Sequence, residues 1–424
     1  MSPLKVIIVG GGLSGACLAN GIGNNADGLI DVTMFERDTE ALSRDGYQIR
    51  LGAHALVGFR ACLTERQYTD CLRCFGRSGG VVSSTPTIFD TNRDLVLDLS
   101  KFPAYQKSAP VGRARLRSFL QAPLRAKNIM RYGMKFTGFD VVDGEASDES
   151  CIRVYFDDGS SQDCDILVSA EGSGSRANKQ VGLNNIIEDV PKAGEGGFLG
   201  KCHLPWDVLR DLPRPLIEKG TIYTASSNAR MFAAAYLPDE VRTSARSPAA
   251  RRDLRRAEKP IDYDEDQASL FVGMAWEDGP SVAEASRLED KKSVMRKMLE
   301  VSGFDPEYFK LVDALDPQEI QAVPWRHSKA DTPVDWREKL LAASKKSQTD
   351  PRIAHPRVWL VGDSIHPMLP YRGMGANQAI HDTADALGPL LELARRKTAD
   401  GSVTDEELRC QVAVYGECHD TESL

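Results

Sequence analysis

The stretch LKVIIVGGGLSGACLANGI, residues 4–22, combines a short apolar strand, a glycine-rich turn and a helix of small residues. Gly10, Gly12 and Gly15 have the GxGxxG spacing. The first glycine allows a tight turn, the second lets the backbone approach a pyrophosphate, and the third lets helix and strand pack closely. The helix N-terminus would then present unpaired N–H groups to the phosphates. The stretch therefore predicts a Rossmann-like unit that binds a dinucleotide.

The acidic residue expected on the adenosine ribose ends a second apolar strand, DVTMFERD, residues 31–38. Glu36 follows the glycines by about 20 positions, where a carboxylate binds ribose hydroxyls. A carboxylate at this place also disfavours a 2′-phosphate. The sequence therefore predicts FAD or NAD, rather than NADP, as the molecule bound by this unit.

Two further strand–loop–helix units follow much later in the chain. In CDILVSAEGSGSRANKQ, residues 164–180, Glu171 and a glycine end an apolar strand. In RVWLVGDSIHPMLPYRGMGANQAIHDTADAL, residues 357–387, Asp363 ends the strand and a helix begins near Asn377. A simple NAD dehydrogenase would not return to this pattern twice. The repetition favours FAD, a long cofactor that several separate parts of the chain contact.

In this order and at these distances, the three units resemble the class A flavoprotein monooxygenases, the single-component aromatic hydroxylases. That family carries GxGxxG, then Asp-Gly after a mid-chain strand, then Gly-Asp, Pro and Gly-x-Gly-x-Asn near the C-terminus. Two more segments are similar to family segments near the flavin, GYQIRL at 46–51 and VGRARLRSFL at 111–120. The resemblance covers nearly the whole chain.

The resemblance implies an α/β fold. A Rossmann-like, GR2-type FAD-binding domain is assembled from separate parts of the chain, and a mixed β-sheet substrate domain packs over the flavin. The expected ranges are 1–76, 107–182 and 350–424 for the FAD-binding domain, and 77–106 and 183–349 for the substrate domain. The stretches 220–239 and 268–278 are rich in β-branched and aromatic residues, as strands are. Residues 77–106 are expected to add a hairpin to the same sheet.

The resemblance also implies which residues contact FAD. Gly10, Gly12 and Gly15 are expected to hold the pyrophosphate, and Glu36 the adenosine ribose. Arg113 is expected along the phosphates and ribityl chain, with Asp363 on a ribityl hydroxyl. The isoalloxazine ring would be lined by Pro370, Gly373, Gly375 and Asn377, and further cofactor contacts are expected from Ser14, Arg37, Glu171 and Ala376. Arg44, just before GYQIRL, is expected to touch the cofactor as well.

Two positions of the middle unit depart from the family pattern. Glu171 replaces the family's aspartate, and Asn178 stands where the family has an arginine, with Arg176 close by. That motif is associated with NAD(P)H as well as with FAD. The departures therefore bear on the affinity for NADPH or NADH, which in this family is a transient co-substrate without a Rossmann unit of its own.

The resemblance implies that NAD(P)H reduces the flavin and that O2 adds at its C4a position. The C4a-hydroperoxide then hydroxylates or epoxidises an aromatic, phenolic or indolic small molecule. One alternative is a flavin-dependent reductase or dehydrogenase without oxygen insertion, and another is a flavin-bound regulatory protein. The late Pro, Gly-x-Gly-x-Asn loop favours the monooxygenase. The substrate itself stays open, because scattered residues assemble its pocket.

Candidates for acting on the substrate are His327, Arg50 and Tyr371. A phenol is activated by a base with a pKa near neutrality, and His327 lies in a segment that returns toward the flavin. Its alternative is a surface histidine beside Arg326. Arg50 lies on the GYQIRL strand, whose side chains alternate between two faces. Tyr371 lies in the flavin loop and serves either flavin or substrate, whereas His366 is expected to position that loop.

Composition and charge narrow the class of protein. The chain has 424 residues, of which 42% are hydrophobic and 27% charged, as in ordinary globular proteins. A net charge of −8 argues against a nucleic-acid partner, and the arginines within 251–256 read as a solvated segment. No apolar run reaches the ~18 residues of a membrane span, and no signal-peptide pattern is present. We therefore expect a cytoplasmic protein, and the oligomeric state stays open.

The nine cysteines have neither the spacing of a disulfide framework nor that of a zinc site. The only CxxC pair, Cys71 and Cys74, lies in a stretch that reads as a helix. We expect these thiols on its buried side, where cysteine behaves as a small apolar residue. The sequence predicts no metal site.

Overall fold

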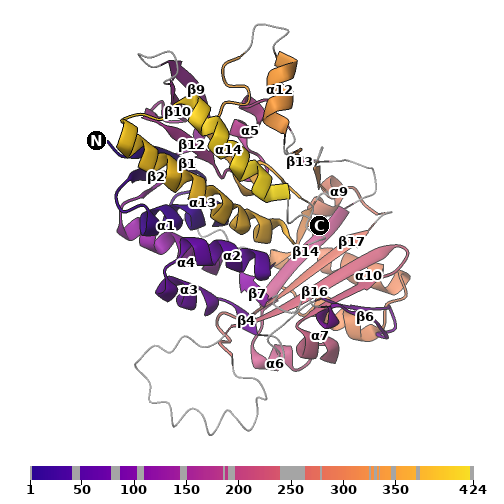
Figure 1. Ribbon diagram of the computed structural model, residues 1–424. Coiled ribbons are helices and arrows are strands. Elements are labelled where there is room, and N and C mark those ends of the chain that lie inside the picture. The colour runs from indigo at the N-terminus through magenta and orange to yellow at the C-terminus, as the bar shows by residue number, and fades with distance from the viewer. Residues whose placement is uncertain are drawn as a thin grey trace, which may run out of the picture.

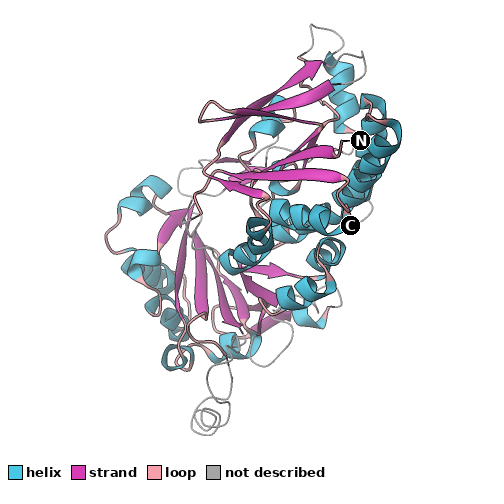
Figure 2. Ribbon diagram, turned by 90° about the vertical axis from the view of Figure 1, so that its left-hand side faces the viewer, coloured by secondary structure: helices cyan, strands magenta, loops and turns pink. Residues whose placement is uncertain are grey.

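The computed structural model describes residues 2–40, 48–77, 86–102, 109–143, 150–184, 187–189, 196–238, 263–276, 279–323, 326–328, 332–333, 335–344, 350–368 and 373–420. It contains a parallel sheet with helices packed on it and, beside this, a larger and mostly antiparallel sheet (Figures 1 and 2). This two-part α/β architecture agrees with the predicted fold class.

The parallel sheet has five strands in the order β20-β12-β1-β2-β8. They are β1 Leu4–Val9, β2 Ile30–Glu36, β8 Met130–Tyr132, β12 Ile166–Ser169 and β20 Val358–Leu360. Every neighbouring pair is parallel, and the strands read as continuous apolar runs because both faces of the sheet are covered. Strands from both ends of the chain thus meet in one sheet.

Alternate residues of β1 face two different cores. Val6 and Ile8 pack among helices on one face, whereas Ile7 and Val9 pack on the other face against a small antiparallel sheet. The helices are α1 Leu13–Asn25, α2 Ala53–Cys62, α3 Glu65–Leu72, α4 Arg113–Ala126, α13 Gly375–Asp400 and α14 Asp405–Asp420. The elements of the second layer are β9 Phe136–Asp143, β10 Ser150–Phe156, β11 Ser161–Cys164, α5 Arg176–Gln180 and α12 Trp336–Ser344.

The larger sheet has eight strands, seven of them in the order β18-β14-β17-β16-β15-β5-β6, with β4 paired to β16. They are β4 Gly76–Arg77, β5 Thr87–Phe89, β6 Leu95–Asp98, β14 Gly196–His203, β15 Thr221–Ala225, β16 Ala229–Pro238, β17 Ser269–Trp276 and β18 Gln321–Val323. The β5–β6 hairpin belongs to this sheet, as expected for that part of the chain.

The two faces of the larger sheet differ. One face is fully buried under short helices, with Ile222, Met231 and Val272 in its core. These helices include α6 Trp206–Leu209, α7 Arg214–Lys219, α9 Val282–Arg287, α10 Lys291–Val301 and α11 Phe309–Asp313. Strand alternation places Tyr223 and Phe232 on the opposite face, where both are only half-buried. That face is the one toward the parallel sheet.

A two-stranded ribbon joins the two parts of the molecule. It pairs β3 Gln48–Leu51 with β7 Ala109–Gly112 in antiparallel register. The Gln48 side chain donates to the Ser269 carbonyl (2.8 Å), and the Tyr236 hydroxyl donates to the Cys74 carbonyl (2.8 Å). A separate ribbon pairs β13 Ile187–Asp189 with β19 Arg326–Ser328.

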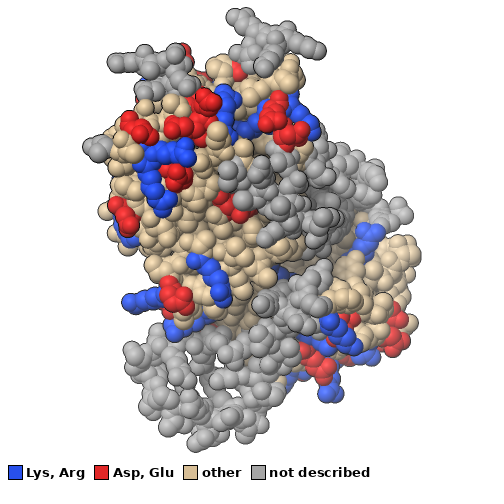
Figure 3. All heavy atoms as spheres, viewed as in Figure 1, with Lys and Arg blue, Asp and Glu red and all other residues tan. Residues whose placement is uncertain are grey.

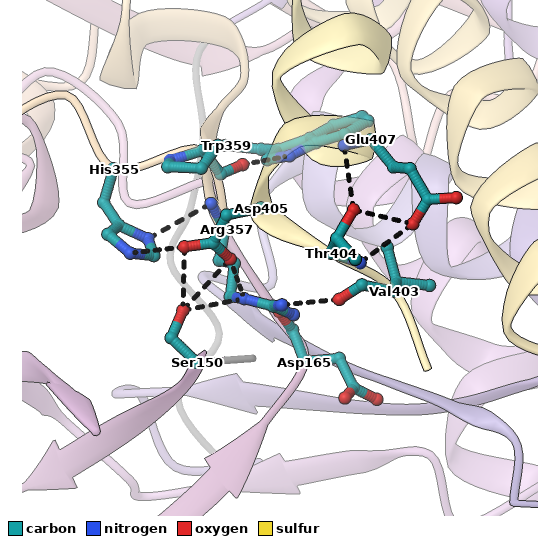
Figure 4. A network of polar contacts seen from close by, with 10 residues as sticks. Ser150, Asp165, His355, Arg357, Trp359, Val403, Thr404, Asp405 and Glu407 are labelled. Carbon is teal, nitrogen blue, oxygen red and sulfur yellow. Dashed lines mark hydrogen bonds and ion pairs between the residues drawn. The ribbon is translucent and has the colours of Figure 1, made fainter. Parts of the chain in front are cut away.

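Just before β20 begins, a polar network around Arg357 connects the parallel sheet to the start of α14 (Figure 4). Arg357 donates to Asp405 (2.7 Å), to the Ser150 hydroxyl (3.0 Å) and to the Val403 carbonyl (2.6 Å). The His355 ring lies 3.6 Å from Asp405. The negative charge of Asp405 raises the pKa of His355, but burial of the ring has the larger effect and lowers that pKa to about 4. The ring is therefore neutral at pH 7, and Arg357 carries the positive charge of the network.

Charged side chains of both signs are mixed on the visible surface of the molecule. In the face shown in Figure 3, acidic and basic side chains lie beside one another. None of the helices within the described ranges is long and apolar enough to cross a membrane.

Cys71 and Cys74 are buried, as predicted, and burial raises the pKa of both thiols. The described residues hold no His, Cys, Asp and Glu cluster suited to a metal.

Candidate functional site

The first glycine loop closes the C-terminal end of β1. Gly10 has φ +105°, and a side chain there would meet the Ala170 carbonyl oxygen at 2.3 Å. A Cβ on Gly15 would lie 2.1 Å from the Gly10 oxygen, so helix and strand are in direct contact there. Around Gly12, by contrast, no heavy atom of the described residues lies within 4 Å of the added Cβ position. Two glycines therefore serve close packing, and Gly12 leaves room for a ligand.

The N-terminus of α1 points its free N–H groups into that room. Gly12 is the N-cap residue, and no described side chain caps the first turn. Unpaired N–H groups and the helix dipole together favour a phosphate. Ser14, in the same turn, is buried. A Cβ added to Gly362 would come within 3.1 Å of its hydroxyl oxygen, so the late unit lies directly against α1.

Glu36 ends β2 beside this loop and is almost fully buried. Its carboxylate accepts from the backbone N–H of Gly11 (2.8 Å) and of Asp38 (3.0 Å). Arg117 forms an ion pair with it at 3.1 Å. A carboxylate has about four acceptor sites, so Glu36 can hold the loop and still accept from a ribose hydroxyl.

Two residues of α4 hold the same loop and were missed by our motif reasoning. Arg117 and Gln121 both donate to the Gly11 carbonyl, at 3.2 Å and 2.6 Å. With Arg113 they are spaced four residues apart on α4, and such residues share one face of a helix. That spacing was the available signal for their role.

Arg37 does not join this group. Its side chain is 59% exposed, and the ion pair it forms within the described ranges is with Asp38, at 4.0 Å. The change of direction after β2 turns it to solvent, while Glu36 turns inward. Arg44 lies outside the described residues.

In the middle unit, the carboxylate of Glu171 accepts hydrogen bonds from neighbouring residues of the same unit. Glu171 accepts from the backbone N–H groups of Arg176 (3.1 Å) and Ala177 (3.0 Å), and from the hydroxyls of Ser169 and Ser175. These contacts hold the first turn of α5, whose free N–H groups require acceptors. Glu171 was predicted to contact FAD, but four protein donors already occupy its carboxylate.

Asn178 ties the middle unit to the late unit. It is fully buried, and its amide donates to the Ser364 carbonyl at 2.8 Å. The Ser364 hydroxyl in turn donates to the Ser169 carbonyl at 2.7 Å. Arg176 is exposed and donates to the Phe136 carbonyl. The asparagine at the family's arginine position thus serves the protein's own framework.

The late unit begins with a 3-10 turn, Gly362–Ser364, directly after β20. Asp363 lies in this turn, and burial raises the pKa of its carboxyl group, while the positive charges of His366 and Arg113 oppose that shift. A Cβ on Gly375 would lie 3.8 Å from an Asp363 oxygen. The predicted ribityl ligand Asp363, the α4 residue Arg113 and the start of α13 therefore meet at one place.

His366 is bound to a buried carboxylate that our motif reasoning did not single out. Its Nε2 lies 2.6 Å from Asp382 of α13, and Asp382 also accepts from the Gly362 N–H at 2.6 Å. Burial lowers the pKa of His366, but the charge of Asp382 and their hydrogen bond together raise it further, so the net shift is upward. His366 thus fastens the late loop to α13, which fits the positioning role expected of it.

This pair gives a pH-dependent contribution to stability. A raised pKa in the folded state means that the contribution is complete below about pH 6.5 and is lost as the pH rises through the folded value. We expect His366→Gln to lower the free energy of unfolding most at about pH 6 and least at about pH 9. Urea unfolding of both proteins across this range checks it, and a difference that grows with pH would contradict it.

Asn377 is buried, and its side-chain amide connects three backbone groups. Its amide oxygen accepts from the Gly52 N–H (2.7 Å), and its amide nitrogen donates to the carbonyls of Arg50 (2.8 Å) and Gly373 (3.1 Å). It thereby joins the late loop to the end of β3. Gly373 has φ +62°, which favours glycine at that turn.

The start of α13 is the second uncapped helix end of the site. Gly375 is its first residue, and no described side chain caps it. The following Ala376 packs on the edge of the main helical core. Predicted residues Pro370 and Tyr371 lie outside the described part of the chain. His327 lies on β19, where its backbone pairs with Glu188, and its side chain is not described.

Comparisons with known proteins agree with this geometry. A family model for an FAD binding domain matches residues 303–408. The dual O-methyltransferase/FAD-dependent monooxygenase elcB of Phaeosphaeria nodorum is 24% identical over 397 residues, covering 90% of this chain and 40% of that protein. CTB3 of Cercospora beticola, which has the same description, is 25% identical over 402 residues, covering 91% and 42%.

In sequence the chain thus resembles FAD-dependent monooxygenases, and its late part matches an FAD binding domain. The chain spans less than half the length of these curated relatives. Among solved structures, a protein of Photorhabdus luminescens assigned as an FAD-containing monooxygenase gives a TM-score of 0.68 at 19% identity, covering 97% of this chain and 94% of that one. HpxO of Klebsiella pneumoniae, complexed with FAD and uric acid, gives 0.58 at 16%, covering 99% and 90%. These likenesses confirm the predicted fold.

FAD is the cofactor that the matched domain binds, and the described residues fit it at both ends. The open space at Gly12, in front of an uncapped helix, suits the pyrophosphate. The second uncapped helix, with Asp363 beside it, lies where the late unit meets α1. An elongated ligand that runs along these two helix ends would satisfy N–H groups at each.

The roles of Asp363 and Glu171 can be separated by mutation. Asp363→Ala is expected to weaken FAD binding by about 10- to 100-fold, because it removes a charged hydrogen-bond acceptor. Glu171→Gln is expected to change FAD affinity by less than about threefold and to lower the free energy of unfolding by about 1–2 kcal/mol, since it weakens the α5 cap. Flavin fluorescence titration and urea unfolding measure the two effects. The reverse ranking of FAD affinities would contradict these assignments.

Proposed function

We propose that this chain is an FAD-dependent monooxygenase that uses NAD(P)H and O2 to hydroxylate or epoxidise an aromatic, phenolic or indolic small molecule. The proposal rests chiefly on one observation. Asn377 at the start of α13 donates to the Arg50 carbonyl, and the Arg50 side chain reaches Thr221, which lies on the same face of the larger sheet as the half-buried Tyr223 and Phe232. A planar molecule on that surface would lie next to the flavin end of the cofactor.

FAD would supply the redox chemistry and the activation of oxygen, while the protein supplies position and shielding. Gly12 and the N-terminus of α1 would hold the pyrophosphate, and Glu36 the ribose. Asp363 and the N-terminus of α13 would hold the ribityl chain. The His366–Asp382 pair keeps the late loop in place, and the sheet above it limits the access of water, which would otherwise consume the activated oxygen.

The curated relatives support a monooxygenase, and one structural neighbour holds uric acid, a planar heterocycle, together with FAD. Planar, partly apolar ligands match the ring-lined surface here, where Phe232 and Phe271 pack edge to face with centroids 6.3 Å apart. The larger sheet would thus select the shape of the substrate, whereas the parallel sheet holds the cofactor.

The deciding experiment follows NADPH or NADH oxidation and O2 consumption together in the FAD-loaded protein, with a panel of phenols, naphthols and indoles. We expect at least one compound to accelerate both, and we expect one atom of ¹⁸O₂ to enter the product. Accelerated NAD(P)H oxidation with no ¹⁸O in the product would instead favour a flavin reductase or dehydrogenase. A protein that takes up no FAD would contradict the proposal entirely.

A further inference from the structure

Arg50 occupies the seam between the flavin loop and the larger sheet. Its carbonyl accepts from Asn377, the residue that also binds Gly373 of the flavin loop. Its side chain extends the other way and reaches the sheet, where Nη1 donates to the Thr221 hydroxyl at 2.5 Å. Arg50 therefore contacts both the start of α13 and the larger sheet, between which the proposed substrate would lie.

Two donor atoms of Arg50, Nε and Nη2, are shielded from solvent, and no residue in the described ranges accepts a hydrogen bond from them. Burial without a compensating charge lowers the pKa of the guanidinium to about 9. Gln48, two positions earlier on the same side of β3, likewise has a buried Oε1 without a hydrogen-bond donor among the described residues.

Such groups are costly in a folded protein. A buried donor without an acceptor carries the desolvation penalty of the lost water contact, and the penalty is larger when the group is charged. Native proteins satisfy nearly all buried polar atoms, and an exception calls for a specific explanation such as a missing ligand. At this seam, a bound small molecule would supply the missing acceptors.

We propose that the Nε–Nη2 edge of Arg50 binds two neighbouring acceptor oxygens of the substrate, at least one of them ionised. This inference rests on the proposed function, and it narrows the substrate to planar aromatic molecules that carry a carboxylate or the enolate of a β-dicarbonyl group. Arg50 would set both affinity and orientation toward the flavin.

The geometry of the side chain supports a two-point contact. The Thr221 hydroxyl holds Nη1, which leaves the opposite edge of the planar guanidinium with two parallel N–H groups. That edge matches two oxygens side by side, as in bidentate arginine–carboxylate pairs. A lysine presents a single point charge and cannot reproduce it. Tyr223 is the next residue on the Thr221 face of β15, so an aromatic surface adjoins the proposed anion contact.

The test uses ligand titration of the FAD-loaded protein, followed by the change in flavin absorbance. The probes are 1-hydroxy-2-naphthoate and its neutral carboxamide, and 2-acetyl-1,3-indandione with neutral 1-indanone. We expect the wild type to bind at least one anion about tenfold or more tightly than its neutral partner, as a charged two-point contact implies. Arg50→Met should abolish that preference, and Arg50→Lys should restore only part of it.

Arg210→Met is the matched control, because that arginine is 59% exposed on the outer surface and should leave both affinities unchanged. The anion that shows the preference identifies which oxygen pair is recognised. Equal affinities for each anion and its neutral partner in the wild type would overturn the inference. So would an Arg50→Met protein that weakens both members of a pair equally, or that loses FAD instead, since the guanidinium would then serve the cofactor.

Failure of the inference can be told apart from failure of the proposed function. The titration needs bound FAD but no turnover, so the anion preference is measurable even if no compound accelerates NAD(P)H oxidation. Conversely, ¹⁸O incorporation into a neutral phenol with unchanged rates in Arg50→Met would leave the monooxygenase proposal intact and remove the role of Arg50.

Discussion

Replacing Gly12 by alanine is expected to lower FAD affinity on the order of 100-fold while the apoprotein keeps its stability within about 0.5 kcal/mol. The added methyl group would enter the open space in front of α1, where it meets no described protein atom but would meet the pyrophosphate. Isothermal titration with FAD and urea unfolding of the apoprotein measure the two quantities separately.

Gly15→Ala is the matched comparison within the same motif. Its Cβ would collide with the Gly10 carbonyl at 2.1 Å, so strand and helix must separate. We expect it to lower the stability of the apoprotein by about 2–3 kcal/mol, as overpacked core substitutions do, and to weaken FAD binding as well. If Gly12→Ala destabilised the apoprotein as much as Gly15→Ala, the space at Gly12 would not be the ligand site.

Arg357→Met is expected to lower the free energy of unfolding by about 3 kcal/mol, because it leaves the largely shielded carboxylate of Asp405 without its cation. Arg357 is nearly inaccessible and makes four donor contacts that bring β20, β10 and the start of α14 together. The network lies where β20 begins, whereas the flavin loop follows its end. FAD affinity of the folded protein should therefore change by less than about threefold.

Arg214→Met provides the control for the loss of an ion pair as such. Arg214 and Glu218 are 2.7 Å apart but 87% and 54% exposed, and such pairs contribute about 0.5 kcal/mol or less. Chemical denaturation of the three proteins gives the comparison. The interpretation of the network would be wrong if both variants lost the same small amount, or if Arg357→Met lost FAD affinity without losing stability.

The cofactor framework was predictable because it depends on local patterns. Apolar runs predicted the strands, and the glycine spacing predicted the turn at Gly10 to Gly15. In the structure, a Cβ atom on Gly10 or Gly15 would collide with neighbouring backbone atoms. The order of the three units was enough to place the late strand in the same sheet as the first. Short-range sequence patterns carry this information since strand and turn preferences are themselves local.

The partners of individual side chains were not predictable in the same way. Glu171 and Asn377 stand at family positions, yet the hydrogen bonds described for them join backbone groups and, for Glu171, two serine hydroxyls of the protein itself. Asp382 lies 16 residues from His366 in sequence and within 2.6 Å in space. Such pairings arise from tertiary packing, which a one-dimensional motif does not encode. Arg50 was predicted as a site residue, but only the structure revealed its free edge.

The order of strands in the parallel sheet also constrains how the protein is made. β20, the strand that joins this sheet last in sequence and directly precedes the turn with Asp363, is synthesised about 350 residues after β1. The Gly10–Gly15 loop and α1 therefore lack the late unit that packs against them until the entire intervening sheet has been produced. Contacts so distant in sequence slow folding and expose incomplete edges to aggregation. With FAD held by the first and the late unit together, as proposed above, its binding would favour the completely assembled sheet.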